Sequence, residues 1–138
     1  MSVVESRVRR LAGWTAPRWY CLAVAVAWLI RAGTTLADGA SFARPGDGWR
    51  AVFQLIVVVV VLVGIRGNGP ALRATVAVGV TYAVLTGLEL LDGHTLFGVI
   101  PVDTRDRFVH PGLAIAAAAC VLANRRRARR MSIYQDVS

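Results

Sequence analysis

The chain has 138 residues, of which 56% are hydrophobic, a mean hydropathy of +0.55 and a net charge of +8. A soluble domain of this length needs fewer hydrophobic residues, so the composition indicates one membrane domain. All basic residues are arginines, and they flank apolar runs. They do not form one basic face with interleaved aromatic residues, which argues against a nucleic-acid partner.

Four apolar segments follow a basic N-terminal flank at residues 1–18 and precede an arginine-rich tail at residues 124–138. Within a membrane domain at residues 19–123, we predict helices at residues 19–37, 49–65, 71–91 and 108–123. A helix is expected even where valines favour a strand, because an isolated strand leaves its backbone groups unpaired in lipid. The sequence therefore predicts an all-α, polytopic membrane protein with a four-helix bundle. A soluble protein with buried valine-rich strands is the alternative.

The arginines also indicate how the chain is oriented in the lipid bilayer. The flank, the connection between the second and third segments, and the tail carry eleven of them, whereas the other two connections carry four arginines and five aspartates. By the positive-inside rule, both termini are expected in the cytoplasm. Arginine without lysine, together with abundant alanine, valine and glycine, indicates a GC-rich bacterial genome, so the expected membrane is a bacterial inner membrane. The arginines of the tail could also bind anionic lipid head groups, each contributing about 1 kcal/mol. They are Arg125, Arg126, Arg127, Arg129 and Arg130.

A weak internal repeat appears at an offset of 56 residues. The matched positions are Pro45, Asp47 and Gln54 in the first half and Pro101, Asp103 and His110 in the second. Each half would contain a helix, an outer loop and a second helix. A tandem two-helix repeat of this kind keeps both halves in the same orientation, with a pseudo-twofold axis along the membrane normal. Chance is the alternative explanation for so few matches.

Residues 96–110, with the sequence Leu-Phe-Gly-Val-Ile-Pro-Val-Asp-Thr-Arg-Asp-Arg-Phe-Val-His, resemble a signature of the bacterial membrane-protein family labelled domain of unknown function 4383. In that family a Leu-Phe-Gly segment leads to an Asn, an Asp-Asn pair, an aromatic or apolar pair, and a His that opens the last helix. Asp103, Asp106, Phe108 and His110 occupy those places here, and Tyr82 corresponds to a tyrosine of the third helix. The resemblance covers residues 19–123 and implies a four-span fold, without a known activity.

The chain also departs from the family pattern. Asp103 and Arg107 stand where the family has Asn, and a proline follows His110 where the family has Leu. In the first half, Asp47 and Gln54 replace the expected Asn and His. If the two histidines of the family share a role, this chain keeps only one of them.

A candidate polar cluster lies on the predicted outer side. It consists of Arg31, Gln54, Glu89, Asp103, Asp106 and His110. A charge inside the bilayer costs about 2.5–3.5 kcal/mol, so Arg31 and Glu89 are expected to pair, or each to reach the interface separately. A third hypothesis is that the cluster lines one outward-facing pocket for a proton or a small ligand, since a histidine titrates near neutral pH. Asp103 and Asp106 also suit caps of the last helix.

The sequence offers little else that could carry chemistry. It contains no nucleophile and base arrangement, no metal-ligand spacing and no phosphate-binding glycine loop, so we expect neither an enzyme nor a cofactor. Haem between two histidines would need both at matched depth, and His94 lies in an outer loop while His110 opens a helix. Cys21 and Cys120 belong to no CxxC pair and are expected to be packing residues.

Three function hypotheses follow. The first is a non-catalytic accessory or scaffold protein, whose small residues at 114–119 and at Gly79 allow close packing with a membrane-protein partner or a second copy. The second is a small transport or ligand-binding protein that uses the outward-facing polar cluster. The third is a redox or haem-binding membrane subunit.

Overall fold

The computed structural model describes residues 13–92 and 95–135. Within these ranges the elements, in chain order, are α2 (Ala16–Ala37), α3 (Asp47–Ile65), α4 (Asn68–Asp92), β1 (Thr95–Leu96), β2 (Ile100–Pro101) and α5 (Asp106–Gln135). Each of the four helices is long and apolar enough to cross a membrane. The predicted all-α fold with four spanning helices is therefore confirmed. Three of the four arginines counted in the N-terminal flank, Arg7, Arg9 and Arg10, lie outside the described residues, as does His94.

The helices begin slightly earlier than predicted. α2 starts at Ala16, where Pro17 suits the first turn because a proline lacks the N–H that this turn leaves unpaired. α3 starts at Asp47, whose carboxylate favours the positive end of the helix dipole. α4 and α5 also start before the predicted residues 71 and 108, at Asn68 and Asp106.

The largest difference lies at the end of the last helix. We expected that helix to stop at residue 123, but α5 continues to Gln135. Alanine and arginine are strong helix formers, and residues 124–135 contain neither glycine nor proline to end the helix. The arginine-rich tail is therefore helical over most of its length.

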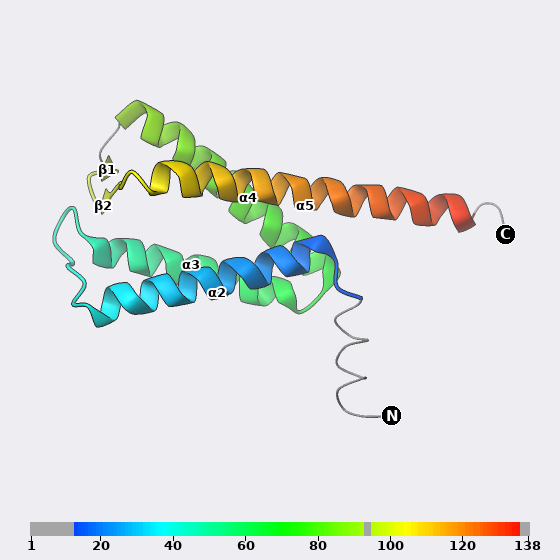
Figure 1. The fold of residues 1–138 in the computed structure, drawn as a ribbon, viewed down its shortest axis with the longest axis horizontal. Coiled ribbons are helices and arrows are strands. Elements are labelled where there is room, and N and C mark those ends of the chain that lie inside the picture. Colours follow the sequence, from blue (N-terminus) through cyan, green and yellow to red (C-terminus); the bar gives the residue numbers. More distant parts are fainter. Residues whose placement is uncertain (1–12, 93–94, 136–138) are drawn as a thin grey trace, which may run out of the picture.

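The helices form two hairpins, α2 with α3 and α4 with α5 (Figure 1). The α2–α3 connection and the β1–β2 strands lie together at one end of the bundle, on the left in Figure 1, which we call the hairpin end. The start of α2 and the α3–α4 turn lie towards the opposite end, and α5 runs out past them. We call this the arginine end, because it holds the arginines near the start of α2, at the end of α3, near the start of α4 and in the last part of α5: Arg18, Arg66, Arg73 and those of the tail.

An apolar core runs along the bundle between the helices. Its buried side chains include Val24, Val61, Val78, Tyr82 and Ala117. Cys21 is buried and Cys120 partly buried, and both are free thiols. The outer faces carry many exposed valines and leucines, which suits helices whose solvent is lipid.

Glycines allow two of these helix contacts to be close. A Cβ atom at Gly64 would lie 2.8 Å from the Cβ of Ala74, and one at Gly79 would lie 2.6 Å from the Cβ of Ala117. Real Cβ atoms do not approach one another so closely, so α3 and α5 could not pack on α4 as they do with larger residues at these positions.

Gly79→Ala is therefore expected to destabilise the α4–α5 contact by about 1–3 kcal/mol, the usual cost of overpacking. Gly87→Ala, in the same helix, is the matched control because nothing lies within 4 Å of its Cβ position. Thermal unfolding of both variants in detergent measures the difference. Ala117→Gly should restore the stability of Gly79→Ala, and equal stability of the two alanine variants would contradict the packing described here.

Candidate functional site

A cavity of about 190 Å³ lies at the hairpin end of the bundle. All four helices and both strands contribute side chains to it, so the cavity exists only in the assembled fold. Its lining is mostly aromatic and aliphatic, with a few polar groups: Trp28, Arg50, Phe53, Gln54, Tyr82, Leu85, Leu96, Phe97, Ile100, Pro101, Val102, Asp106 and His110.

The β1–β2 hairpin forms one wall of this cavity. Leu96 pairs with Ile100 in the antiparallel register, and the turn between them places Phe97 and Gly98 at positive φ, 55° and 67°. The amide of Gly46 donates to the carbonyl of Val99 at 3.0 Å, which attaches the α2–α3 connection to the hairpin. This hairpin was not predicted from the sequence. A Phe-Gly pair between apolar residues is the signal that could have indicated it, because glycine suits a tight hairpin turn.

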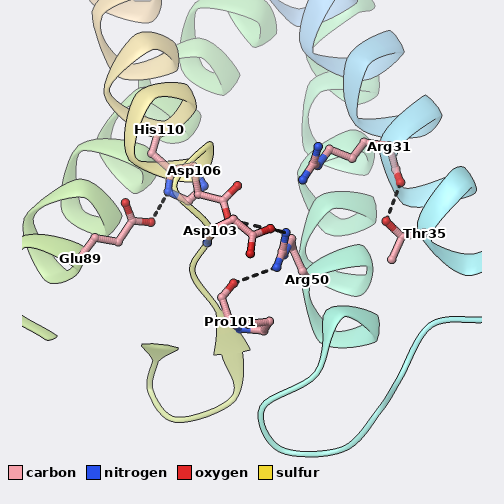
Figure 2. A network of polar contacts seen from close by, with 8 residues as sticks. All are labelled: Arg31, Thr35, Arg50, Glu89, Pro101, Asp103, Asp106 and His110. Atoms are coloured by element: carbon pink, nitrogen blue, oxygen red, sulfur yellow. Dashed lines mark hydrogen bonds and ion pairs between the residues drawn. The ribbon is translucent and has the colours of Figure 1, made fainter. Parts of the chain in front are cut away.

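Arg50 of α3 connects this hairpin to α5 (Figure 2). One guanidinium nitrogen lies 2.6 Å from Oδ2 of Asp103 and the other donates to the carbonyl of Pro101 at 3.0 Å. Oδ2 of Asp106 lies 3.7 Å from the same guanidinium and accepts from the amide of Asp103 at 3.1 Å. Asp106 therefore holds the start of α5, whereas Asp103, expected as a cap, binds Arg50 through its carboxylate.

Glu89 and His110 form a second polar contact, between α4 and α5. Nδ1 of His110 lies against Oε1 of Glu89, and the side chain of Glu89 is almost fully buried. His110 lines the cavity, while Glu89 also lines a cleft of about 180 Å³ with Thr86, Leu90 and Arg107. The Glu89–His110 pair thus lies between two hollows of the molecule.

The expected pairing of Arg31 with Glu89 is wrong. Glu89 contacts His110 on the adjacent helix, and Figure 2 shows Arg31 apart from them on α2. Among the described residues, the Arg31 guanidinium has no hydrogen bond or ion pair; only its backbone carbonyl accepts, from the hydroxyls of Thr34 and Thr35. The sequence indicated similar depths for Arg31 and Glu89, but α4 turns Glu89 towards α5.

Polar atoms without partners are concentrated at the cavity. Within the described part of the chain, four buried side-chain atoms lack a hydrogen bond: Trp28 Nε1, Arg50 Nε, Gln54 Oε1 and Glu89 Oε2. The first three belong to residues that line the cavity. A buried polar atom left unpaired costs about 1–3 kcal/mol. These atoms are themselves enclosed by protein, so they add to the cost of the fold at the hairpin end.

The structure brings most of the candidate polar cluster together. Gln54, Asp106 and His110 line the cavity, while Asp103 and Glu89 each contact a lining residue. Arg31 is the member that stands apart. Three further lining residues were not among the predicted site residues: Trp28, Arg50 and Tyr82. The internal repeat could have indicated Arg50, because the offset of 56 residues matches this cation with the anion Asp106.

Residues 13–92 and 95–135 contain no group of three or more His, Cys, Asp or Glu side chains placed to hold a metal ion.

Comparison of the chain with protein-family models, with curated proteins and with solved structures finds no match. The resemblance of residues 96–110 to the family with the Leu-Phe-Gly signature therefore stays a prediction.

Arg50→Ala is expected to lower the free energy of unfolding by about 2 kcal/mol. This is less than the roughly 3–5 kcal/mol for breaking a fully buried pair, because Asp103 is 55% exposed. Arg31→Ala is the matched control and should change stability by less than about 0.5 kcal/mol. Equilibrium unfolding in detergent micelles measures both.

A double-mutant cycle checks the cause of that loss. Asp106→Ala in the Arg50→Ala background should cost less than Asp106→Ala alone, because Arg50→Ala already leaves the buried Asp106 carboxylate without its cation. Equal effects of Arg50→Ala and Arg31→Ala, or strictly additive effects of Arg50→Ala and Asp106→Ala, would contradict the role given to Arg50.

Proposed function

We propose that this chain is a small-molecule-binding membrane protein whose ligand occupies the cavity at the hairpin end. One observation carries the proposal: a cavity of about 190 Å³, assembled from all four helices and both strands, has a mostly apolar lining with a few polar residues, Arg50, Gln54, Asp106 and His110. Ligand sites are typically apolar hollows with a small number of placed polar groups, since apolar area supplies affinity and polar atoms fix orientation. This arrangement favours the second of the three function hypotheses.

The cost of the site supports the same conclusion. Gln54 is 3% exposed, and its side-chain oxygen has no partner among the described residues. A leucine of similar size would fill this position without an unpaired polar atom. A residue that lowers the stability of the fold without improving its packing is expected where function requires it.

A non-catalytic accessory or scaffold protein is the second candidate, and α5 is the observation that favours it. Only 11% of the apolar window of α5 is buried within the bundle, against 33–39% for the other three helices. Its uncovered face carries small residues such as Ala116, Ala118 and Ala119, which permit close approach of another helix. A partner protein or a second copy would pack there, away from the cavity.

We further propose that the chain resides in a bacterial inner membrane with the arginine end in the cytoplasm, and that the tail arginines contact anionic lipid head groups there. The positive-inside rule supports this orientation, because arginines gather at that end while aspartates gather near the hairpin end. The cavity would then open towards the outer side. No redox or haem chemistry is included in the proposal.

The orientation predicts the outcome of reporter fusions. A fluorescent protein fused after residue 138 should fluoresce, and alkaline phosphatase fused within the α2–α3 connection should be active, since each reporter works on only one side of the membrane. Active phosphatase at the C-terminus would reverse the proposed orientation.

The proposed site predicts the behaviour of Gln54→Leu. Without ligand this variant should be at least as stable as the parent chain, because it removes an unpaired buried oxygen. Fragments that raise the unfolding temperature of the parent chain should bind Gln54→Leu about tenfold more weakly, a loss of about 1.4 kcal/mol.

The matched control is Thr75→Val, a buried polar residue that does not line the cavity. It should leave fragment affinity unchanged. A library of small uncharged fragments that yields no binder, or binders that are indifferent to Gln54→Leu, would overturn the proposed function.

A further inference from the structure

We infer that a groove between α4 and α5 binds one anionic phospholipid, with an acyl chain along the groove and the phosphate at Arg125. The proposed function includes a general contact of the tail arginines with anionic head groups. The inference rests on that contact and deepens it, because it assigns one arginine and one groove to a single lipid molecule. The groove shares no lining residue with the hairpin-end cavity, so the ligand of that cavity plays no part here.

The groove is an apolar hollow of about 400 Å³. Apart from Thr75 and Arg125, its lining consists of alanine, valine, leucine and glycine. Thr75 is buried, and its hydroxyl already donates to the carbonyl of Pro17 at 3.3 Å. Gly79 and Ala117, which make the close contact between the two helices, both line the groove. The walls therefore suit a hydrocarbon chain, which needs no hydrogen-bond partner.

The length of the groove matches one leaflet of the bilayer. On α5 its lining runs from Ala114 to Arg125, a step of eleven residues, which is about 16 Å at about 1.5 Å per residue. Half of a hydrocarbon core of about 30 Å is about 15 Å. An acyl chain whose head group lies at Arg125 can therefore follow the groove to the middle of the bilayer.

Arg125 supplies the contact for the head group. Among the described residues that line the groove, it is the one with a charge, and it lies at the arginine end. Its side chain is exposed and follows the last apolar residues of α5, at the level where phosphates of the leaflet are expected. A guanidinium binds a phosphate through two parallel N–H donors. An anionic lipid is thus held at both ends of the groove by matching chemistry.

Charge favours a lipid over a second copy of this chain as the occupant. A second copy that placed its own α5 in the groove would have the same orientation in the membrane. Its arginine-rich tail would then lie beside this one, and like charges at short distance repel. A phospholipid places a negative charge at the same position, which the arginines attract.

The test compares two lipids with identical acyl chains, anionic phosphatidylglycerol and uncharged phosphatidylcholine. Native mass spectrometry of the full chain in detergent counts the lipids bound across a concentration series. We expect one phosphatidylglycerol to bind about fivefold more tightly than phosphatidylcholine, the effect of one arginine near a membrane surface. Glycerol 3-phosphate, which has the phosphate without acyl chains, should give no bound species.

Two pairs of variants examine the two ends of the groove. Arg125→Gln should abolish the preference for phosphatidylglycerol, whereas Arg127→Gln should keep it, because Arg127 does not line the groove. Ala118→Leu should weaken the binding of both lipids about fivefold, since the larger side chain fills the hollow. Ala116→Leu is its matched control, an exposed position of α5 outside the groove.

Equal effects of Arg125→Gln and Arg127→Gln, or of Ala118→Leu and Ala116→Leu, would overturn the site and leave the general contact of the tail with anionic lipid in place. Equal binding of the two lipids by the parent chain would overturn that contact as well. A dimer in the same spectra that Ala118→Leu dissociates would show that a second copy occupies the groove, and would contradict the inference.

Discussion

The ion pairs of Arg50 are the constraint on which the hairpin end depends. A guanidinium near the end of a spanning helix must be paired or reach water, because an unpaired charge in lipid costs several kcal/mol. Arg50 is paired by Asp103 and Asp106, and its second nitrogen binds the carbonyl of Pro101 in β2. One side chain of α3 thereby fixes a two-stranded hairpin that is too short to be stable alone, together with the start of α5. The cavity follows from this, since the hairpin is one of its walls.

Two pairs of positions that the repeat offset matches lie together at the hairpin end, which supports the predicted duplication. Positions 56 residues apart meet at the cavity: Arg50 contacts Asp106, and Gln54 and His110 both line it. Equivalent residues come together in this way when they lie near the axis that relates two repeats. A duplicated two-helix unit would therefore form its cavity where the two halves meet. Later divergence of the two copies would explain why one pair of equivalent positions carries opposite charges, Arg50 and Asp106. The duplication remains a hypothesis that this pairing supports.

The four spanning helices could be predicted from the sequence because each is a continuous apolar run, and lipid leaves no other structure for it. The hairpin could not, since strands of two residues are too short to show alternation. The partner of Glu89 was missed for a different reason. Position along the chain gives the depth of a residue in the membrane, but the direction in which Glu89 and Arg31 point depends on how the helices are rotated in the bundle. Gln54 and His110 were foreseen as polar exceptions in apolar segments, whereas Trp28 and Tyr82 resemble ordinary core or interface residues until the cavity is seen.

The most direct measurement is the distance between the hairpin and α3 with and without Arg50. Spin labels are attached at Phe97→Cys and Val63→Cys in a background with Cys21→Ala and Cys120→Ala. Phe97 lies on the exposed turn of the hairpin, and Val63 lies on the exposed face of α3, thirteen residues or about 20 Å along the helix from Arg50. Pulsed electron spin resonance should give one narrow distance distribution for the parent chain. In Arg50→Ala the distribution should broaden, because the hairpin loses its attachment to α3. An identical narrow distribution in both would show that Arg50 does not hold the hairpin over the cavity.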